Sequence, residues 1–447
     1  LDQQIYNYLL SAKRHAKTNA RGEIKNIDLV SRSIKEAVDA IGERQGIRIT
    51  EAYAGISGQH IRSVKQPYYV FASRGGEIRQ EDVRQLHDSM RNVPAPEGEK
   101  ILQIIPQNYI VDDEEETANP VGTFGNKLAS TFNIILGDSV AINRLEMALK
   151  RVDIVPLGLF LNAIASAEAV LTPDEKEEGV AVVDIGAGTT DVVVYQKNII
   201  RHVGIIPMGG NVINKDIRSY GILEKHVENL KTRYGEAMRD AAQPDKYITT
   251  PGLSAKASKE ISSQNLAAII EARMLDIIDF VVEELKKSGF QDRLAAGVVL
   301  TGGGAQLKHV ETLFKSYTGM DARVAGAEST LDGESLETAG QPAMATAVGI
   351  LARAFDERAQ NKTSRSKQQV VRPAKEEKPV TEPASPVKRK LNDFYRSGSR
   401  PHEEEGAGLQ DDAYEPEYKP KRKPGLFSKL REKVINMFDE EIEDNEI

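Results

Sequence analysis

The 447-residue chain contains no cysteine and no tryptophan, and its seven histidines show no metal-ligand spacing. The absence of cysteine excludes disulfides and thiolate metal sites and argues against a secreted scaffold held together by disulfides. No apolar run approaches the ~18 residues that a membrane-spanning helix needs, and no signal-peptide pattern is visible. The net charge of −8 argues against a general nucleic-acid binder. At this length we expect more than one hydrophobic core, because single cores stop growing near ~250 residues.

The most informative segment lies at residues 179–195, where two β-branched runs flank a turn rich in glycine, threonine and aspartate. The runs have the composition of buried strands. Glycines in the turn let backbone amides approach a phosphate, threonine hydroxyls can add donors, and Asp184 can hold a water of hydrated Mg²⁺. The expected phosphate contacts are Asp184, Gly186, Ala187, Gly188, Thr189, Thr190 and Asp191. The alternative is a β-hairpin whose glycines serve only turn geometry.

A second glycine-rich loop follows the short apolar strand at residues 295–300 and precedes a helix. Its residues are Thr301, Gly302, Gly303 and Gly304. Three glycines leave a surface without side chains, against which a flat ring and its sugar can lie. The alternative is a turn that only lets the helix pack close to the sheet. Together the two loops predict a nucleotide held from two sides.

These two loops resemble the second phosphate motif and the adenosine motif of the actin-like ATPases, a superfamily that includes Hsp70 chaperones and sugar kinases. Within it, the chain resembles the FtsA family of bacterial cell-division proteins over about residues 24–353. The segments that carry the resemblance are residues 55–61, 104–109, 119–122 and 206–217, and residues 162–168 and 342–349 are similar to the two connecting helices. The resemblance implies an α/β, actin-like (ribonuclease H-like) two-domain fold with an inserted small α+β subdomain, a disordered linker and a C-terminal amphipathic helix.

The chain departs from this superfamily at its start. Members open with a strand and a first phosphate loop of the form Asp-x-Gly-[Ser/Thr], and nothing before Asp184 matches it. Residues 2–10 would correspond to a later strand of the first subdomain, so we expect the N-terminal hairpin to be missing from this sequence. A version with the hairpin restored is expected to bind ATP more tightly, and equal affinities in a titration would contradict this expectation.

The resemblance also divides the chain into subdomains. The expected parts are 1A (residues 1–61 and 153–178), the inserted 1C (62–152), 2A (179–220 and 295–355), a helical 2B (221–294), the linker (356–423) and the membrane-targeting helix with its acidic end (424–447). Local patterns predict helices at residues 24–45, capped near Asn26 or Asp28, and 81–92. They also predict strands at residues 47–54 and 100–105 and an acidic loop at residues 112–116.

Further site candidates lie after the glycine-rich turn that follows Asp184. Gly209, Gly210 and Asn211 open a helix whose N-terminal amides could approach the γ-phosphate. The resemblance implies that Glu228 contacts the ribose and Lys231 the base; the alternative is an exposed i, i+3 ion pair of little energetic value. Asp216 could complete a cation shell, or it could cap a helix or be solvated.

The C-terminal region changes composition after Phe355. Residues 356–423 hold few large apolar side chains and should form a disordered tether, with ends on the order of 45 Å apart. A basic amphipathic helix should follow and bind the membrane surface. Its membrane-binding residues are Leu426, Phe427, Lys429, Leu430, Arg431, Lys433, Val434, Met437 and Phe438. The alternative is a helix that docks on its own body or on a partner protein.

As a member of this family the chain would bind ATP and Mg²⁺, polymerise, and tether the tubulin-like division protein FtsZ to the inner face of the cytoplasmic membrane at the division site. The resemblance implies that the FtsZ C-terminal tail docks on residues 221–294 and that later divisome proteins also bind. No motif marks an activated nucleophile or general base, so weak or no ATP hydrolysis is expected. The rival interpretations are a kinase or Hsp70-type enzyme, and an actin-like scaffold of a pilus or secretion assembly.

Overall fold

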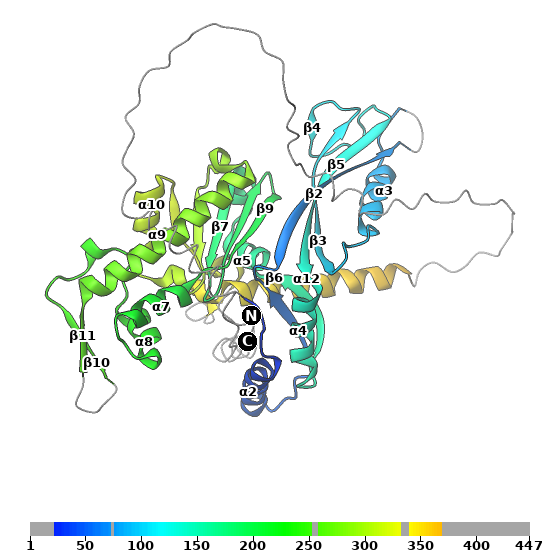
Figure 1. Cartoon of the computed structure of the whole chain (residues 1–447). Helices are drawn as coiled ribbons and strands as arrows, with labels where there is room; N and C mark the ends of the chain where they lie inside the picture. Colours follow the sequence, from blue (N-terminus) through cyan, green and yellow to red (C-terminus); the bar gives the residue numbers. More distant parts are fainter. Residues whose placement is uncertain (1–21, 73–75, 253–257, 332–338, 369–447) are drawn as a thin grey trace, which may run out of the picture. The chain divides into compact units, whose positions relative to one another are not determined.

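The computed structural model describes residues 22–72, 76–252, 258–331 and 339–368 (Figure 1). The α-helices are α2 (Ile27–Gln45), α3 (Gln80–Arg91), α4 (Ser139–Lys150), α5 (Asn162–Val170), α6 (Pro173–Glu178), α7 (Gly210–Ser219), α8 (Glu224–Tyr234), α9 (Ser263–Ser288), α10 (Val310–Thr318) and α12 (Ala345–Gln368). The strands are β1 (Glu51–Ile56), β2 (Ile61–Phe71), β3 (Glu99–Val111), β4 (Glu116–Thr117), β5 (Lys127–Asp138), β6 (Val155–Leu161), β7 (Val180–Ile185), β8 (Thr190–Gln196), β9 (Ile199–Ile206), β10 (Tyr247–Pro251), β11 (Ser258–Ser262), β12 (Val298–Thr301) and β13 (Ala322–Val324).

A five-stranded sheet in the order β13-β12-β7-β8-β9 forms the centre of the fold. β13, β12 and β7 are parallel, and β7, β8 and β9 form an antiparallel meander. Every residue of β7 and β12 is buried. Strands covered on both faces need continuous apolar runs, which explains the valine-rich sequence on either side of the turn.

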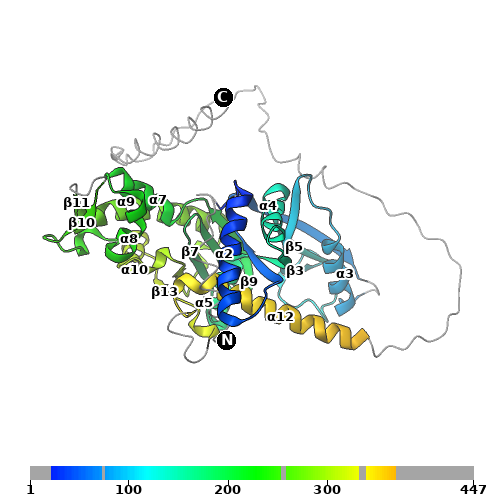
Figure 2. The same ribbon diagram turned by 90° about the horizontal axis from the view of Figure 1, so that it is seen from below.

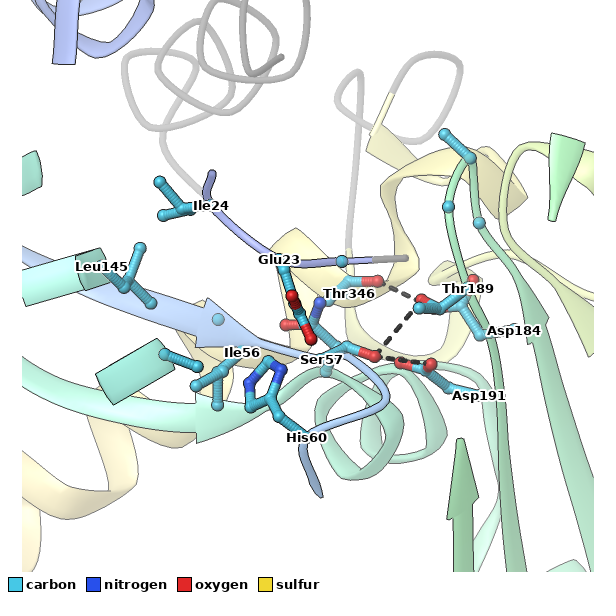
Figure 3. A pocket seen from close by; sticks show the side chains of 17 residues that line it. Glu23, Ile24, Ile56, Ser57, His60, Leu145, Asp184, Thr189, Asp191 and Thr346 are labelled. Atoms are coloured by element: carbon cyan, nitrogen blue, oxygen red, sulfur yellow. Dashed lines mark hydrogen bonds between the residues drawn. The ribbon is translucent and has the colours of Figure 1, made fainter. Parts of the chain in front are cut away.

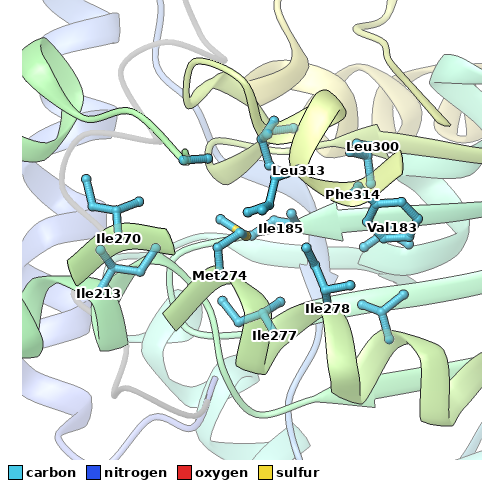
Figure 4. Close-up of a cluster of buried hydrophobic side chains, with 14 of the residues drawn as sticks. Val183, Ile185, Ile213, Ile270, Met274, Ile277, Ile278, Leu300, Leu313 and Phe314 are labelled. Carbon is cyan, nitrogen blue, oxygen red and sulfur yellow. The ribbon is translucent and has the colours of Figure 1, made fainter. Parts of the chain in front are cut away.

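Alternate side chains of β7 enter two different cores, as the two-residue repeat of a strand requires. Val183 and Ile185 pack with α9 and α10, and Figure 4 shows them with Met274, Ile278 and Phe314. Val182 belongs to the opposite core, which contains residues of α5 and α12. Asp184 has the same parity as Val182. The strand therefore delivers the Asp184 carboxylate to the side of the sheet where α5 and α12 lie.

β1 and β6 form a separate two-stranded parallel sheet that is only partly covered. Val155 and Leu157 of β6 are 57% and 39% exposed. α12 and α5 cross closely beside this sheet: a Cβ at Gly349 would lie 1.8 Å from the Ala165 carbonyl oxygen, so only glycine permits the crossing. α2 packs alongside α4 (Figure 2), with Ser31 Oγ donating to the Ala148 carbonyl oxygen at 3.1 Å.

The block between β1 and β6 is an antiparallel sheet, β2-β5-β3-β4, with α3 on one face. The Asp138 amide donates to the His60 carbonyl at 3.1 Å, so the block starts and ends at adjacent points. A bulge in β3 turns Gln107 and Asn108 toward β9. Gln107 Nε2 donates to the Ile200 carbonyl at 2.9 Å, and Arg201 donates to Asn108 Oδ1 at 3.1 Å.

Most predicted elements are present, with shifts at several ends. α2 begins at Ile27 with Asn26 as its N-cap, since the Asn26 side chain accepts from the Leu29 amide at 3.0 Å. The strand predicted at residues 47–54 lies at Glu51–Ile56, and residues 155–161 form β6 before the connecting helix begins at Asn162. Residues 221–294 are not purely helical, because β10 and β11 form a hairpin before α9.

Several predictions fall at or beyond the limits of the described residues. α12 continues to Gln368, past the predicted start of the linker. The strand expected at residues 2–10, the rest of the linker and the amphipathic stripe from Leu426 to Phe438 lie outside the described residues. Within the residues that the structure describes, no helix is both long and apolar enough to cross a bilayer.

Candidate functional site

The turn at residues 186–189 joins β7 to β8 and projects into a pocket. The Gly186 amide donates to the Thr189 carbonyl at 2.9 Å and closes the turn. The amides of Ala187 and Gly188 have no acceptor in the part of the chain that the structure describes. Unpaired backbone donors at a glycine-rich turn are the kind of groups that can accept an anion, so the turn leaves donors available for the phosphate contacts expected from the sequence.

The pocket has a volume of about 240 Å³ and lies between this turn and the segment that follows β1 (Figure 3). Sequence reasoning missed five of its polar residues: Glu23, Ser57, His60, Asn162 and Thr346. The segment containing Ser57 and His60 carried part of the family resemblance, but no chemical pattern marked either residue. Asn162 and Thr346 lie in the two connecting helices, far from the turn in sequence, so only the tertiary fold brings them to the pocket.

Asp184 lines the pocket while its carboxylate is held by both connecting helices. Ser166 Oγ donates to Asp184 Oδ2 at 2.5 Å, and Thr346 Oγ1 donates to the same oxygen at 2.9 Å. The two hydroxyl oxygens also lie 2.9 Å apart. These contacts fix the carboxylate at the crossing of α5 and α12, and Oδ2 is the oxygen that they occupy.

Asp191 is the second buried carboxyl group of the pocket. Its position follows from the β7–β8 register, in which Asp184 pairs with Asp191 and both side chains lie on one face. Ser57 Oγ donates to Asp191 Oδ1 at 2.7 Å. Burial and the nearby Asp184 charge raise the pKa of Asp191 to about 7, against the opposing hydrogen bonds from Ser57 and Thr189. Asp191 can therefore change protonation state near neutral pH.

The charge of the pocket decides what it can hold. Glu23, Asp184 and Asp191 line it, and none of its described lining residues is lysine or arginine. A bare phosphate would therefore meet net negative charge, and it fits the pocket only together with a cation. Carboxylate oxygens and water are the ligands that Mg²⁺ prefers, so the residues present fit a phosphate-bound Mg²⁺ held through Asp184.

Several polar atoms at the pocket also lack a hydrogen-bond partner. Both ring nitrogens of His60 and Oδ1 of Asn162 are buried without a hydrogen-bond partner among the described residues. Burial lowers the pKa of His60, although the charges of Glu23 and Asp138 oppose this effect. Leaving such groups unpaired costs free energy, which a polar ligand or water in the pocket would recover.

Three of the predicted phosphate contacts, Thr190, Gly210 and Asn211, use their hydrogen-bonding groups elsewhere in the structure. Thr190 pairs with Ile185 and faces away from the pocket, where its hydroxyl donates to the Met208 carbonyl at 2.9 Å. The amides of Gly210 and Asn211 donate to the carbonyls of Gly186 and Ala187 at 2.9 and 2.8 Å. The start of α7 is therefore used to support the phosphate turn, and these two amides are not free for a γ-phosphate.

Two of the three glycines in the second glycine loop lie against neighbouring residues of the protein, whereas the sequence predicted that all three form a surface for a nucleotide. Gly302 has φ +85°, and a Cβ there would lie 2.2 Å from Asp184 Oδ1. A Cβ on Gly304 would lie 2.3 Å from the Ile185 side chain. Only Gly303 faces open space, and the loop continues into a 3-10 turn (Gly304–Gln306) rather than directly into a helix.

Glu228 and Lys231 do lie beside the start of α7. Lys231 Nζ donates to the Gly210 carbonyl at 3.1 Å and to Glu228 Oε2 at 2.9 Å. The Lys231 side chain is 10% exposed and that of Glu228 is 60% exposed. The pair is thus more than a surface ion pair, because its lysine is anchored to backbone next to the phosphate turn. Asp216 is not available to a cation, since Arg273 binds both of its oxygens, at 2.7 and 3.1 Å.

Comparison with known proteins identifies the family. The model for cell division protein FtsA matches residues 181–349, and the model for the SHS2 domain inserted in FtsA matches residues 58–136. Cell division protein FtsA of Neisseria meningitidis serogroup B is 36% identical over 332 residues, which is 74% of this chain and 80% of the relative. That of Escherichia coli K12 is 31% identical over 339 residues, covering 74% and 80%.

A solved structure agrees on the fold. The PilM-PilN type IV pilus biogenesis complex is similar with a TM-score of 0.50 at 16% identity, covering 76% of this chain and 88% of that chain. At this identity the likeness shows the fold alone. The sequence matches and the inserted β2-β5-β3-β4 block lead to one conclusion: the chain belongs to the FtsA family of cell division proteins, with an actin-like fold and an inserted SHS2 domain.

Proposed function

We propose that the pocket, together with Glu228 and Lys231 beside the start of α7, binds Mg·ATP. The observation that carries this proposal is the pair of unpartnered amides at Ala187 and Gly188 above an acidic pocket. The phosphates would accept from these amides, and Asp184 would hold a water of the Mg²⁺. Glu228 and Lys231 would lie at the ribose and base, and Gly303 would leave room for the ring.

Calorimetric titration of the full chain with ATP and Mg²⁺ tests this site. Asp184→Asn keeps the side-chain shape but removes the charge, and it should weaken Mg·ATP binding by at least about tenfold. Asp216→Asn is the matched control, because Asp216 is bound to Arg273 away from the pocket. Equal affinity in all three proteins, or no ATP binding by the unsubstituted chain, would contradict the proposal.

We further propose that the protein self-associates and attaches FtsZ to the inner face of the cytoplasmic membrane through residues 424–447. Family membership and the basic amphipathic pattern of that segment support this proposal. A single helix of this size would bind reversibly, whereas several helices on one polymer would bind firmly, because each further helix attaches at an effective concentration in the ~mM range. Membrane attachment and polymerisation should therefore reinforce each other.

Co-flotation with anionic vesicles tests the membrane role. The unsubstituted chain should float and should carry FtsZ with it. A chain without residues 424–447, or with Lys429, Arg431 and Lys433 changed to Glu, should remain in the soluble fraction. If the charge-reversed chain still floats to the same extent, the proposed mode of attachment is wrong.

A further inference from the structure

We infer that Asn214 is a positioning residue that orients Glu228 for the ribose of a bound nucleotide, an inference that rests on the proposed nucleotide site. Asn214 lies on α7, one helical turn after Gly210, and therefore on the same face of that helix. Glu228 lies on α8. Asn214 Nδ2 donates to Glu228 Oε2 at 2.5 Å, so the side-chain amide joins the two helices.

Two donors hold a single oxygen of Glu228. Lys231 Nζ and Asn214 Nδ2 both donate to Oε2, at 2.9 and 2.5 Å. The Glu228 side chain is 60% exposed, and Oε1 has no partner among the described residues. One carboxylate oxygen is thereby fixed and the other is left as a charged acceptor. A ribose offers hydroxyl donors, which are the groups that such an acceptor binds.

The free-energy balance at Asn214 points to a role in binding rather than in stability. Oδ1 of Asn214 is buried without a partner among the described residues, which costs free energy. Asn also has a lower helix propensity than Ala in the middle of a helix. The acceptor end of the side chain is thus unfavourable for folding, whereas its donor end makes a charge-assisted bond to Glu228.

The test compares ATP with 2′-deoxyATP and 3′-deoxyATP, each titrated with Mg²⁺ into the full chain. In Asn214→Ala we expect ATP affinity to fall about tenfold. Affinity for the deoxynucleotide that lacks the bound hydroxyl should change by less than about twofold, so the preference for ribose collapses. The melting temperature should change little, because the bond to the exposed Glu228 and the unpaired Oδ1 are lost together. Asn229→Ala is the matched control, because Asn229 is an exposed asparagine of α8 next to Glu228. This variant should leave the affinity for ATP relative to each deoxynucleotide unchanged.

Glu228→Gln shows whether Asn214→Ala changes the ribose preference through Glu228 or in another way. If Asn214 acts through Glu228, the double variant should discriminate no worse than Glu228→Gln alone. An unchanged ribose preference in Asn214→Ala overturns this inference while leaving nucleotide binding intact. Failure of the unsubstituted chain to bind ATP overturns the proposed function and this inference with it.

Discussion

The five-stranded sheet and the two-stranded β1–β6 sheet both reach the pocket, but they are supported differently. β7 and β12 are buried along their whole length, whereas every residue of β1 except Ile56 is at least partly exposed. Asp184, Asp191 and the phosphate turn come from the first sheet, and Ser57 comes from the loop after β1. Asp184 and Asp191 are therefore held by strands that a hydrophobic core covers on both faces. The position of the loop after β1, on the other side of the pocket, depends more on individual polar contacts, such as the hydrogen bond from Ser57 to Asp191.

The largest expected effect comes from matched leucine truncations in the two sheets. Leu300→Ala in β12 removes a fully buried side chain, and we expect the free energy of unfolding to fall by about 3 kcal/mol. Leu157→Ala in β6 removes a side chain that is 39% exposed, with a loss under about 1 kcal/mol. Urea unfolding measures both, and equal losses would show that the two sheets are equally well packed.

The next effect concerns pH. The folded pKa of Asp191, about 7, lies above its ordinary value of 3.8, so the folded state binds more protons than the unfolded state between these values. The free energy of unfolding should therefore fall as pH rises from about 4 to about 7. Asp191→Asn removes this loss. We expect the variant to be about 2 kcal/mol more stable than the unsubstituted chain at pH 8 and nearly equal to it at pH 4. A constant difference across this range would contradict the argument.

Removing the metal tests the acidic lining of the pocket without changing the protein. Because no lysine or arginine lines the pocket among the described residues, the phosphates lose their counter-charge when Mg²⁺ is chelated. Excess EDTA should weaken ATP binding by about tenfold or more, roughly 1.4 kcal/mol. Binding of adenosine, which carries no phosphate, should not change. Isothermal titrations of both ligands with and without chelator provide the comparison. An ATP affinity that does not depend on the metal would contradict the proposed role of Mg²⁺.

The smallest effect is expected at the hydrogen bond from Ser57, after β1, to Asp191 of β8. Ser57→Ala removes the donor to Asp191 Oδ1 and should lower the free energy of unfolding by about 1 kcal/mol at pH 8. It should also raise the pKa of Asp191 further, because the lost hydrogen bond favours the ionised form. Ser63→Ala, at an exposed position of β2, is the control and should change neither quantity. An NMR titration of the Asp191 carboxyl carbon measures the pKa.

The sequence predicted the elements of the site better than their side-chain directions. The turn, the strands around it and the start of α7 follow from apolar runs and glycines. Thr190 was assigned wrongly, because the four-residue turn pairs it with Ile185 and not with Asp184. Counting that register along the sequence could have shown that Asp191, not Thr190, shares a face with Asp184.

Contacts between distant segments could not be predicted in this way. The roles of Ser57 and Thr346 depend on where the β1 loop and α12 pack, and no local pattern encodes that packing. The amides of Gly210 and Asn211 looked free because helix starts usually expose unpaired donors. In the fold, carbonyls of the phosphate turn occupy them. The same limit applies to the glycine loop, where Gly302 and Gly304 are required by neighbours that the sequence does not reveal.

The hydrogen bond between the Asp138 amide and the His60 carbonyl bears on the ancestry of the chain. A module whose two ends meet can be gained, exchanged or lost in one recombination event without rerouting the host polypeptide. The β2-to-β5 block could therefore be altered or replaced without displacing β1 and β6, the strands that precede and follow it in the chain.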